Sequence, residues 1–154
     1  MKKILIASDH AAYDLKQQFI KNNPDLPWED LGPANADSVD YPDYAKKLCA
    51  KLIELTGRDP ITEDAFNSGI CGILICGSGQ GMAIAANKYP QIRAALCWNE
   101  DVAKLSRNHN NANVLCLGSR DVTPEIAQKI LTTFLGSAFE GGRHSQRVAK
   151  IALK

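Results

Sequence analysis

The chain has 154 residues, 45% of them hydrophobic and 23% charged, a composition typical of one soluble globular domain over residues 1–154. Eighteen basic residues face seventeen acidic ones, and a net charge of +1 gives no reason to expect nucleic acid or a membrane as a partner. No apolar run approaches the roughly 20 residues of a membrane span, and MKKILIASDH has too few apolar residues for a signal peptide.

Apolar segments alternate with helical patterns along the chain. In chain order, the expected strands are residues 3–8, 28–31, 70–76, 92–98 and 113–118. The expected helices are residues 11–22, 42–55, 83–88, 99–107, 124–135 and 143–153. The polar stretch 58–69 predicts a surface loop or a short helical insert.

The expected strands are apolar throughout rather than alternating, which is typical of a parallel sheet buried on both faces. Right-handed crossovers then predict a three-layer α/β/α sandwich around a five-stranded parallel sheet, a Rossmann-like fold. The order of the strands cannot be predicted from these patterns.

The five cysteines are odd in number and contain no CxxC pair. This pattern predicts reduced thiols in a cytoplasmic protein rather than a disulfide framework. The cysteines are Cys49, Cys71, Cys76, Cys97 and Cys116.

Ligands of such sheets bind at the carboxyl ends of the strands, so the residues that follow each strand are the candidates for a site. They are Asp9 and His10 after the first strand, Cys76 with residues 77–81 after the third, Asn99 after the fourth, and Ser119 and Arg120 after the fifth. We expect them to lie along one edge.

The loop at residues 77–81 reads GSGQG and is followed by Met82. A dinucleotide fingerprint needs GxGxxG after the first strand. Here the loop follows the third strand, and its third glycine comes one residue earlier than the fingerprint requires. A plain turn explains one or two glycines but not three together with Ser78. Backbone amides at a helix start favour a cradle for an anion. Cys76 beside such a cradle is either a usable base or nucleophile, or a packed small residue.

The histidines are His10, His109 and His144, and none has HxxxH or HxH spacing. We therefore expect no metal site. His109 lies in SRNHNNAN, where we expect it to reach the same strand edge as Cys76. Arg143 and Arg147 share one helical face, which suits a phosphate dianion or, alternatively, is only a solvated basic face.

Five segments occur in order over nearly the whole chain: SDHAA, DYPDYA, GILICGSGQGMAIAANK, LSRNHNNANVLCLGSR and EGGRHSQRV. Together they resemble type B ribose-5-phosphate isomerases, a family that also contains allose-6-phosphate and galactose-6-phosphate isomerases. The resemblance implies an aldose–ketose isomerase of the pentose phosphate pathway that works through a cis-enediolate without metal or cofactor. It also implies a homodimer, or a dimer of dimers, whose active sites draw on both subunits, with the last helix reaching toward the partner.

The resemblance also implies roles for individual residues. Cys76 matches the catalytic base, because Met82 stands where another branch of the family has a glutamate. Ser78 matches the group that assists proton movement between the sugar oxygens, and His109 the ring-opening residue. The remaining matches are Asp9 and Tyr41 for the sugar, His10, Arg120, Arg143 and Arg147 for the phosphate, and Asn110 with the backbone of Gly77, Gly79 and Gly81 for the oxyanion.

Other functions remain open at this point. The substrate could be a six-carbon sugar phosphate, since pocket depth is not legible from sequence. A non-catalytic phosphosugar sensor would need the cradle and the arginines but not Cys76 or His109. A cysteine hydrolase would use Cys76 with His109 but would not need the arginine cluster.

Overall fold

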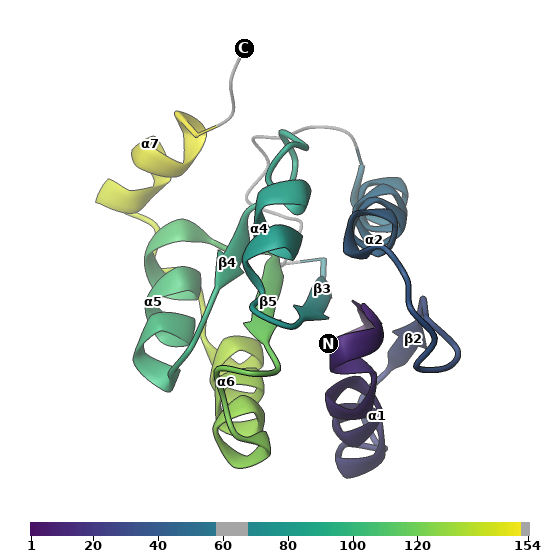
Figure 1. Ribbon diagram of the computed structural model, residues 1–154. Helices are drawn as coiled ribbons and strands as arrows, with labels where there is room; N and C mark the ends of the chain where they lie inside the picture. The colour runs from purple at the N-terminus through teal and green to yellow at the C-terminus, as the bar shows by residue number, and fades with distance from the viewer. Residues whose placement is uncertain (58–67, 152–154) are drawn as a thin grey trace.

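The computed structural model describes residues 1–57 and 68–151, so the predicted loop at 58–69 lies almost wholly outside the described residues. Five strands form one parallel sheet in the order β2-β1-β3-β5-β4, which confirms the predicted sheet (Figure 1). The strands are β1 (Lys3–Ser8), β2 (Trp28–Asp30), β3 (Ile70–Cys76), β4 (Ala94–Leu96) and β5 (Val114–Gly118).

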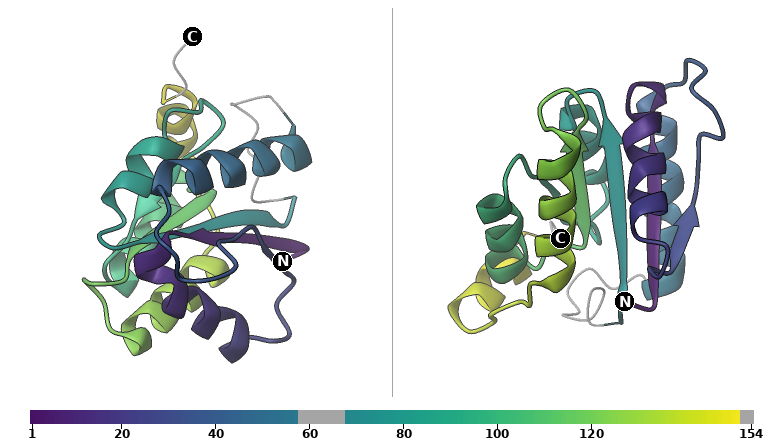
Figure 2. Two further views of the ribbon diagram at one scale, coloured as in Figure 1. Left: turned by 45° about the vertical axis from the view of Figure 1, so that its right-hand side comes forward. Right: turned by 90° about the horizontal axis from the view of Figure 1, so that it is seen from below.

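Helices cover both faces of the sheet, as the left view of Figure 2 shows. The helices are η1 (His10–Ala12), α1 (Tyr13–Asn22), α2 (Tyr41–Thr56), α4 (Gln80–Ala86), α5 (Glu100–Asn110), α6 (Pro124–Gly136) and α7 (Arg143–Ala149). Leu48 of α2 and Met82 of α4 pack on one face, and Phe19 of α1, Ala103 of α5 and Phe134 of α6 pack on the other. No helix in these described segments combines the length and apolar character that a membrane span needs.

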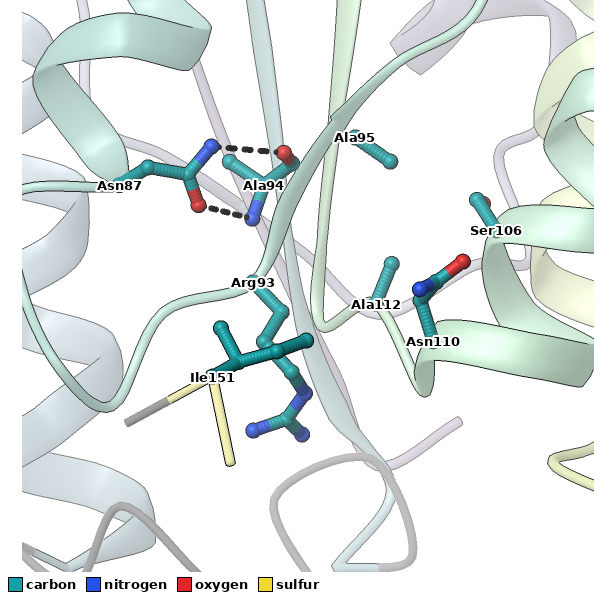
Figure 3. A pocket seen from close by; sticks show the side chains of 8 residues that line it. All are labelled: Asn87, Arg93, Ala94, Ala95, Ser106, Asn110, Ala112 and Ile151. Atoms are coloured by element: carbon teal, nitrogen blue, oxygen red, sulfur yellow. Dashed lines mark hydrogen bonds between the residues drawn. The ribbon is translucent and has the colours of Figure 1, made fainter. Parts of the chain in front are cut away.

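The central strands are apolar throughout because both of their faces are covered. Along β3, Ile73 and Ile75 enter one core cluster, while Leu74 and Cys76 enter the other. β4 is shorter than the predicted 92–98 because it lies at the sheet edge and pairs with β5 alone. The side-chain amide of Asn87 bonds both backbone groups of Ala94, each at 2.9 Å, and so occupies part of the free edge (Figure 3).

The strand order creates a switch point between β1 and β3, because the chain leaves these neighbouring strands toward opposite sides of the sheet. Such points form the crevice in which α/β proteins bind ligands. The backbone N–H of Asp9 donates to the carbonyl of Ile75 at 3.1 Å, which ties the end of β1 to the end of β3.

Three helices of the described residues differ clearly in extent from the prediction: α4 spans Gln80–Ala86 rather than 83–88, and α5 and α7 end elsewhere than expected. α5 continues to Asn110 rather than residue 107, since the Asn99 side chain caps its start and Asn111 ends it at a φ of 48°. His109 and Asn110 therefore lie in the last helical turn and not in a loop. α7 ends at Ala149, and residues 152–154 of the predicted 143–153 helix lie outside the described residues.

Candidate functional site

Cys76 ends β3 at the switch point and is only 4% exposed. The backbone N–H of Gly79 donates to its Sγ at 3.1 Å. A hydrogen bond from an amide stabilises negative charge on sulfur, which is the form that acts as a base. One amide of the predicted anion cradle thus faces the sulfur.

The other four cysteines differ from Cys76 in their surroundings. Burial raises the pKa of Cys49 and of Cys71 to about 12 and that of Cys97 to about 11, and it raises the pKa of Cys116 well above its usual value. These thiols are held neutral as packed residues. Proximity to the glycine loop, and not the residue type, therefore singles out Cys76.

The glycine loop packs against the turn that follows β5. The backbone N–H groups of Ser119 and Arg120 donate to the carbonyls of Cys76 and Gly77 at 2.9 and 3.0 Å. Gly79 has a φ of 73°, and a Cβ there would lie 2.7 Å from the Leu117 backbone, so only glycine fits. The exposed Arg120 guanidinium lies against Gly77, and a Cβ added to Gly77 would lie 3.2 Å from the guanidinium carbon.

Asp9, His10 and Tyr41 approach the loop from the β1 side. Asp9 is buried and caps η1 by accepting the backbone N–H of Ala12 at 3.1 Å. The His10 ring accepts the backbone N–H of Val39 at 3.3 Å. The Tyr41 ring, 40% exposed at the start of α2, occupies the space where Gly81 lacks a side chain.

These residues form one group at the carboxyl edge of the sheet, as the sequence predicted. We refer to them as the carboxyl-edge group: Asp9, His10, Tyr41, Cys76, Gly77, Ser78, Gly79, Gly81 and Arg120. Ser78 is exposed, and its hydroxyl accepts the backbone N–H of Gln80 at 3.4 Å.

The expectation that His109 reaches this same edge is wrong. α5 starts at the carboxyl end of β4 and returns to the start of the parallel strand β5, so its last turn lies at the amino edge. β5 has five residues, so about 3.3 Å per residue puts roughly 15 Å between the two edges. In the right view of Figure 2 the strands rise from the N-terminus at the bottom, and α7 lies at that lower end.

We refer to the residues at this opposite end as the amino-edge group: His109, Asn110, Arg143 and Arg147. α7 packs on α5 through a stack of His144 on His109, with ring centroids 4.2 Å apart and ring planes within 6° of parallel. Arg143 and Arg147 are exposed on α7 beside this stack. Within one chain, the candidate residues thus form two separate groups.

A pocket of about 200 Å³ lies beside the amino-edge group (Figure 3). Asn110, Ser106 and the end of the described chain, Ile151, contribute to its walls. The buried guanidinium of Arg93, whose Nε donates to the carbonyl of Asn111 at 2.9 Å, also borders it. This pocket holds no candidate base and lies at the opposite edge from Cys76.

Glu140 is a neighbour of His109 that the sequence reasoning missed. Its Oε2 lies 3.8 Å from Nε2 of His109 and 3.9 Å from Nε2 of His144. The signal that could have found it is the four-residue spacing of Glu140 and His144 within EGGRHSQRV.

His109, Glu140 and His144 offer ligand atoms within 4.8 Å of one another. The absence of a spacing motif was therefore an incomplete reason to exclude a metal, because folding brings ligands together from distant segments. Imidazole lone pairs lie in the ring planes, and parallel stacked planes do not direct two lone pairs at one point. A shared ion would require one ring to turn out of the stack.

We therefore predict that dialysis of the protein against a strong chelator leaves unchanged its rate in the sugar-phosphate isomerisation that the sequence resemblance implies. The measurement is the initial rate before and after dialysis, with metal analysis of the dialysed protein. A loss of rate that a single divalent ion restores would contradict the prediction and assign the cluster to metal binding.

Comparisons with known proteins agree on one family. The sequence pattern of the Ribose/Galactose Isomerase family matches residues 4–151. The chain is 40% identical to ribose-5-phosphate isomerase B of Escherichia coli strain K12, over 98% of this chain and 95% of that protein.

Solved structures match over nearly their full length. A ribose 5-phosphate isomerase from Thermotoga maritima gives a TM-score of 0.86 at 45% identity, covering 97% of both chains. Ribose-5-phosphate isomerase B from Mycoplasma genitalium, solved with bound ribulose-5-phosphate, gives a TM-score of 0.83 at 42% identity, covering 97% of this chain and 93% of that one. With its parallel sheet and its glycine loop after β3, the chain belongs to the ribose/galactose isomerase family.

Proposed function

We propose that this protein interconverts ribose 5-phosphate and ribulose 5-phosphate. The observation that carries the proposal is Cys76, placed at the switch point with the Gly79 amide donating to its Sγ. Family membership supports the reaction class, and the relative with bound ribulose-5-phosphate supports the five-carbon substrate. Five free cysteines fit a cytoplasmic setting, in which thiols stay reduced.

The proposed reaction is a proton transfer between adjacent carbons. The Cys76 thiolate takes the proton from C2 of the open-chain aldose, and negative charge develops on O1 in a cis-enediolate. The Ser78 hydroxyl passes a proton from O2 to O1, and the thiol then returns a proton to C1 as C2 becomes the ketone. Amides of the glycine loop stabilise the developing oxyanion.

The separation of the two residue groups supports an active site shared between two chains. The carboxyl-edge group has a base but only His10 and Arg120 of the four expected phosphate contacts, whereas the amino-edge group has His109 and the other two arginines but no base. In a two-fold dimer, the amino-edge group of each chain can face the carboxyl-edge group of the other. We propose this homodimer, with α7 of one chain reaching the partner's site; a dimer of dimers would contain the same unit.

The test is an absorbance assay of ribose 5-phosphate conversion without added metal. Allose 6-phosphate and galactose 6-phosphate are assayed in parallel, and the substrate with the highest kcat/KM identifies the preferred sugar. Binding of ribose 5-phosphate without conversion would instead indicate a sensor, and turnover of an acyl ester would indicate a hydrolase.

His109→Asn provides a separate prediction about ring opening. Ribulose 5-phosphate cannot form a furanose because its C5 oxygen carries the phosphate, so the reverse reaction starts from an open chain. We expect the forward rate of the variant to stop rising with enzyme concentration, because spontaneous ring opening in solution becomes limiting. The reverse rate should stay proportional to enzyme concentration.

The wild-type protein is the control and should remain linear in both directions over the same range of concentrations. If His109→Asn lowers the forward and reverse rates equally and both stay linear, His109 serves proton transfer or folding and not ring opening.

A further inference from the structure

The surroundings of His109 are more elaborate than a surface ring requires. Its side chain is 37% exposed, yet His144, which stacks on it, is buried. Glu140 faces both rings with one carboxylate oxygen. Glu140 and His144 therefore both lie against the His109 ring.

Glu140 is fixed to α5 by two hydrogen bonds to one residue. Asn108 Nδ2 donates to Oε1 of Glu140 at 3.0 Å, and the Glu140 backbone N–H donates to the Asn108 carbonyl at 3.0 Å. These bonds leave Oε2 directed at the two imidazoles. The carboxylate is 53% exposed, so its position depends on these bonds and not on burial.

The chain after Glu140 turns sharply so that His144 can return to the stack. Gly141 and Gly142 have φ angles of 65° and 55°, a region that L side chains rarely adopt. α7 starts directly after this turn, and the His144 backbone N–H donates to the Gly141 carbonyl at 3.0 Å. The sequence EGGRH therefore places a carboxylate and an imidazole around one ring of α5.

We propose that Glu140 and His144 are positioning residues that hold His109 in the orientation for ring opening. The carboxylate engages Nε2 of His109 and leaves Nδ1 for the substrate, and the stacked imidazole fixes the plane of the ring. In ring opening the C1–O4 bond breaks, O1 loses a proton and O4 gains one. The inference rests on the proposed role of His109 and extends it to two residues that do not touch the sugar.

The charges around the stack give a direction for its pH dependence. Burial lowers the pKa of His144, and His109, Arg143 and Arg147 lower it further, while Glu140 raises it. Glu140 is thus the one group named here that favours the imidazolium form. Glu140→Gln should lower the pKa of His144 further, because its imidazolium loses the neighbouring carboxylate, and should therefore shift the acidic limb of the forward pH profile to lower pH.

The test compares Glu140→Gln with Glu100→Gln in both directions of the reaction. Glu100 is also 53% exposed and lies at a similar distance, 3.9 Å, from Lys129, but it is at the other end of α5. We expect Glu140→Gln to lower forward kcat on ribose 5-phosphate by about 10-fold and to change reverse kcat on ribulose 5-phosphate by less than about 3-fold. Glu100→Gln should change neither.

His144→Phe tests the stack separately from its titration. The phenyl ring keeps a flat face against His109, so this variant should retain more forward kcat than His144→Ala. NMR of the His109 ring nitrogens supplies a readout independent of activity, and Glu140→Gln should change the chemical shifts that report the tautomer of this ring.

The outcomes separate this inference from the proposed function. A wild-type protein that converts neither pentose phosphate would overturn both. An active wild type with equal forward and reverse losses in Glu140→Gln, or with forward kcat and His109 nitrogen signals unchanged, would overturn the positioning role alone.

Discussion

Cys76→Ala should lower kcat for ribose 5-phosphate by at least about 100-fold, the usual contribution of a general base. The substitution removes one sulfur atom from the buried end of β3 and leaves the glycine loop and its contacts with the β5 turn in place. Substrate binding should therefore survive, because none of the proposed phosphate contacts involves sulfur. Turnover and calorimetric binding of ribose 5-phosphate measure the two effects separately.

Cys71→Ala is the matched control, since Cys71 lies on the same strand but in the other core cluster. Burial raises its pKa to about 12, so it has no thiolate to contribute near neutral pH. It should retain turnover within about 3-fold and lose stability by about 1 kcal/mol, a typical cost of a core truncation. Near-normal turnover in Cys76→Ala would reduce Cys76 to a packed residue.

The carboxyl-edge group, apart from Tyr41 at the start of α2, was predictable because its prediction needs only the ends of strands. In a parallel sheet every strand finishes at the same edge, so Asp9, Cys76 and Arg120 lie along that edge whatever the strand order, and the adjacency of β1, β3 and β5 then makes them neighbours. The apolar runs of β3 and β5 marked those ends clearly. The order β2-β1-β3-β5-β4, by contrast, depends on how helices of similar apolar character pack, and no short segment encodes it.

The position of His109 was mispredicted although it follows from the order of the elements. Residue 109 comes shortly before β5, so it lies at the amino edge whether α5 ends at residue 107 or at Asn110, and the prediction overlooked this by placing a segment before a strand at the edge where strands end. Glu140 was missed for a different reason: its spacing from His144 is interrupted by two glycines, and only the packing of α7 on α5 brings both to His109. Tertiary contacts of this kind leave little trace in periodicity.

The proposed sharing of active sites between two chains predicts a second large effect, the recovery of activity from two inactive variants. Cys76→Ala damages the carboxyl-edge group, and Arg147→Ala damages the amino-edge group. Arg147 is exposed, so its truncation should not disturb folding. In the proposed homodimer each variant alone carries its lesion in both sites, and we expect both variants to be nearly inactive.

When the two variants are unfolded together and refolded, about half of the dimers should be mixed. In a mixed dimer with shared sites, one site combines both lesions and the other combines neither. About one quarter of all sites are then intact, and roughly that share of wild-type activity should return.

Cys76→Ala refolded with Arg120→Ala is the control, because both lesions lie in the carboxyl-edge group and no intact site can form. Activity in this control should not exceed the mean of its parents. Native mass spectrometry can verify that mixed dimers of Cys76→Ala and Arg147→Ala form. If these dimers form but stay inactive, Cys76 and Arg147 serve the active site of the same chain. The separation of roughly 15 Å between the two edges of one chain would then have to close by a movement of α7.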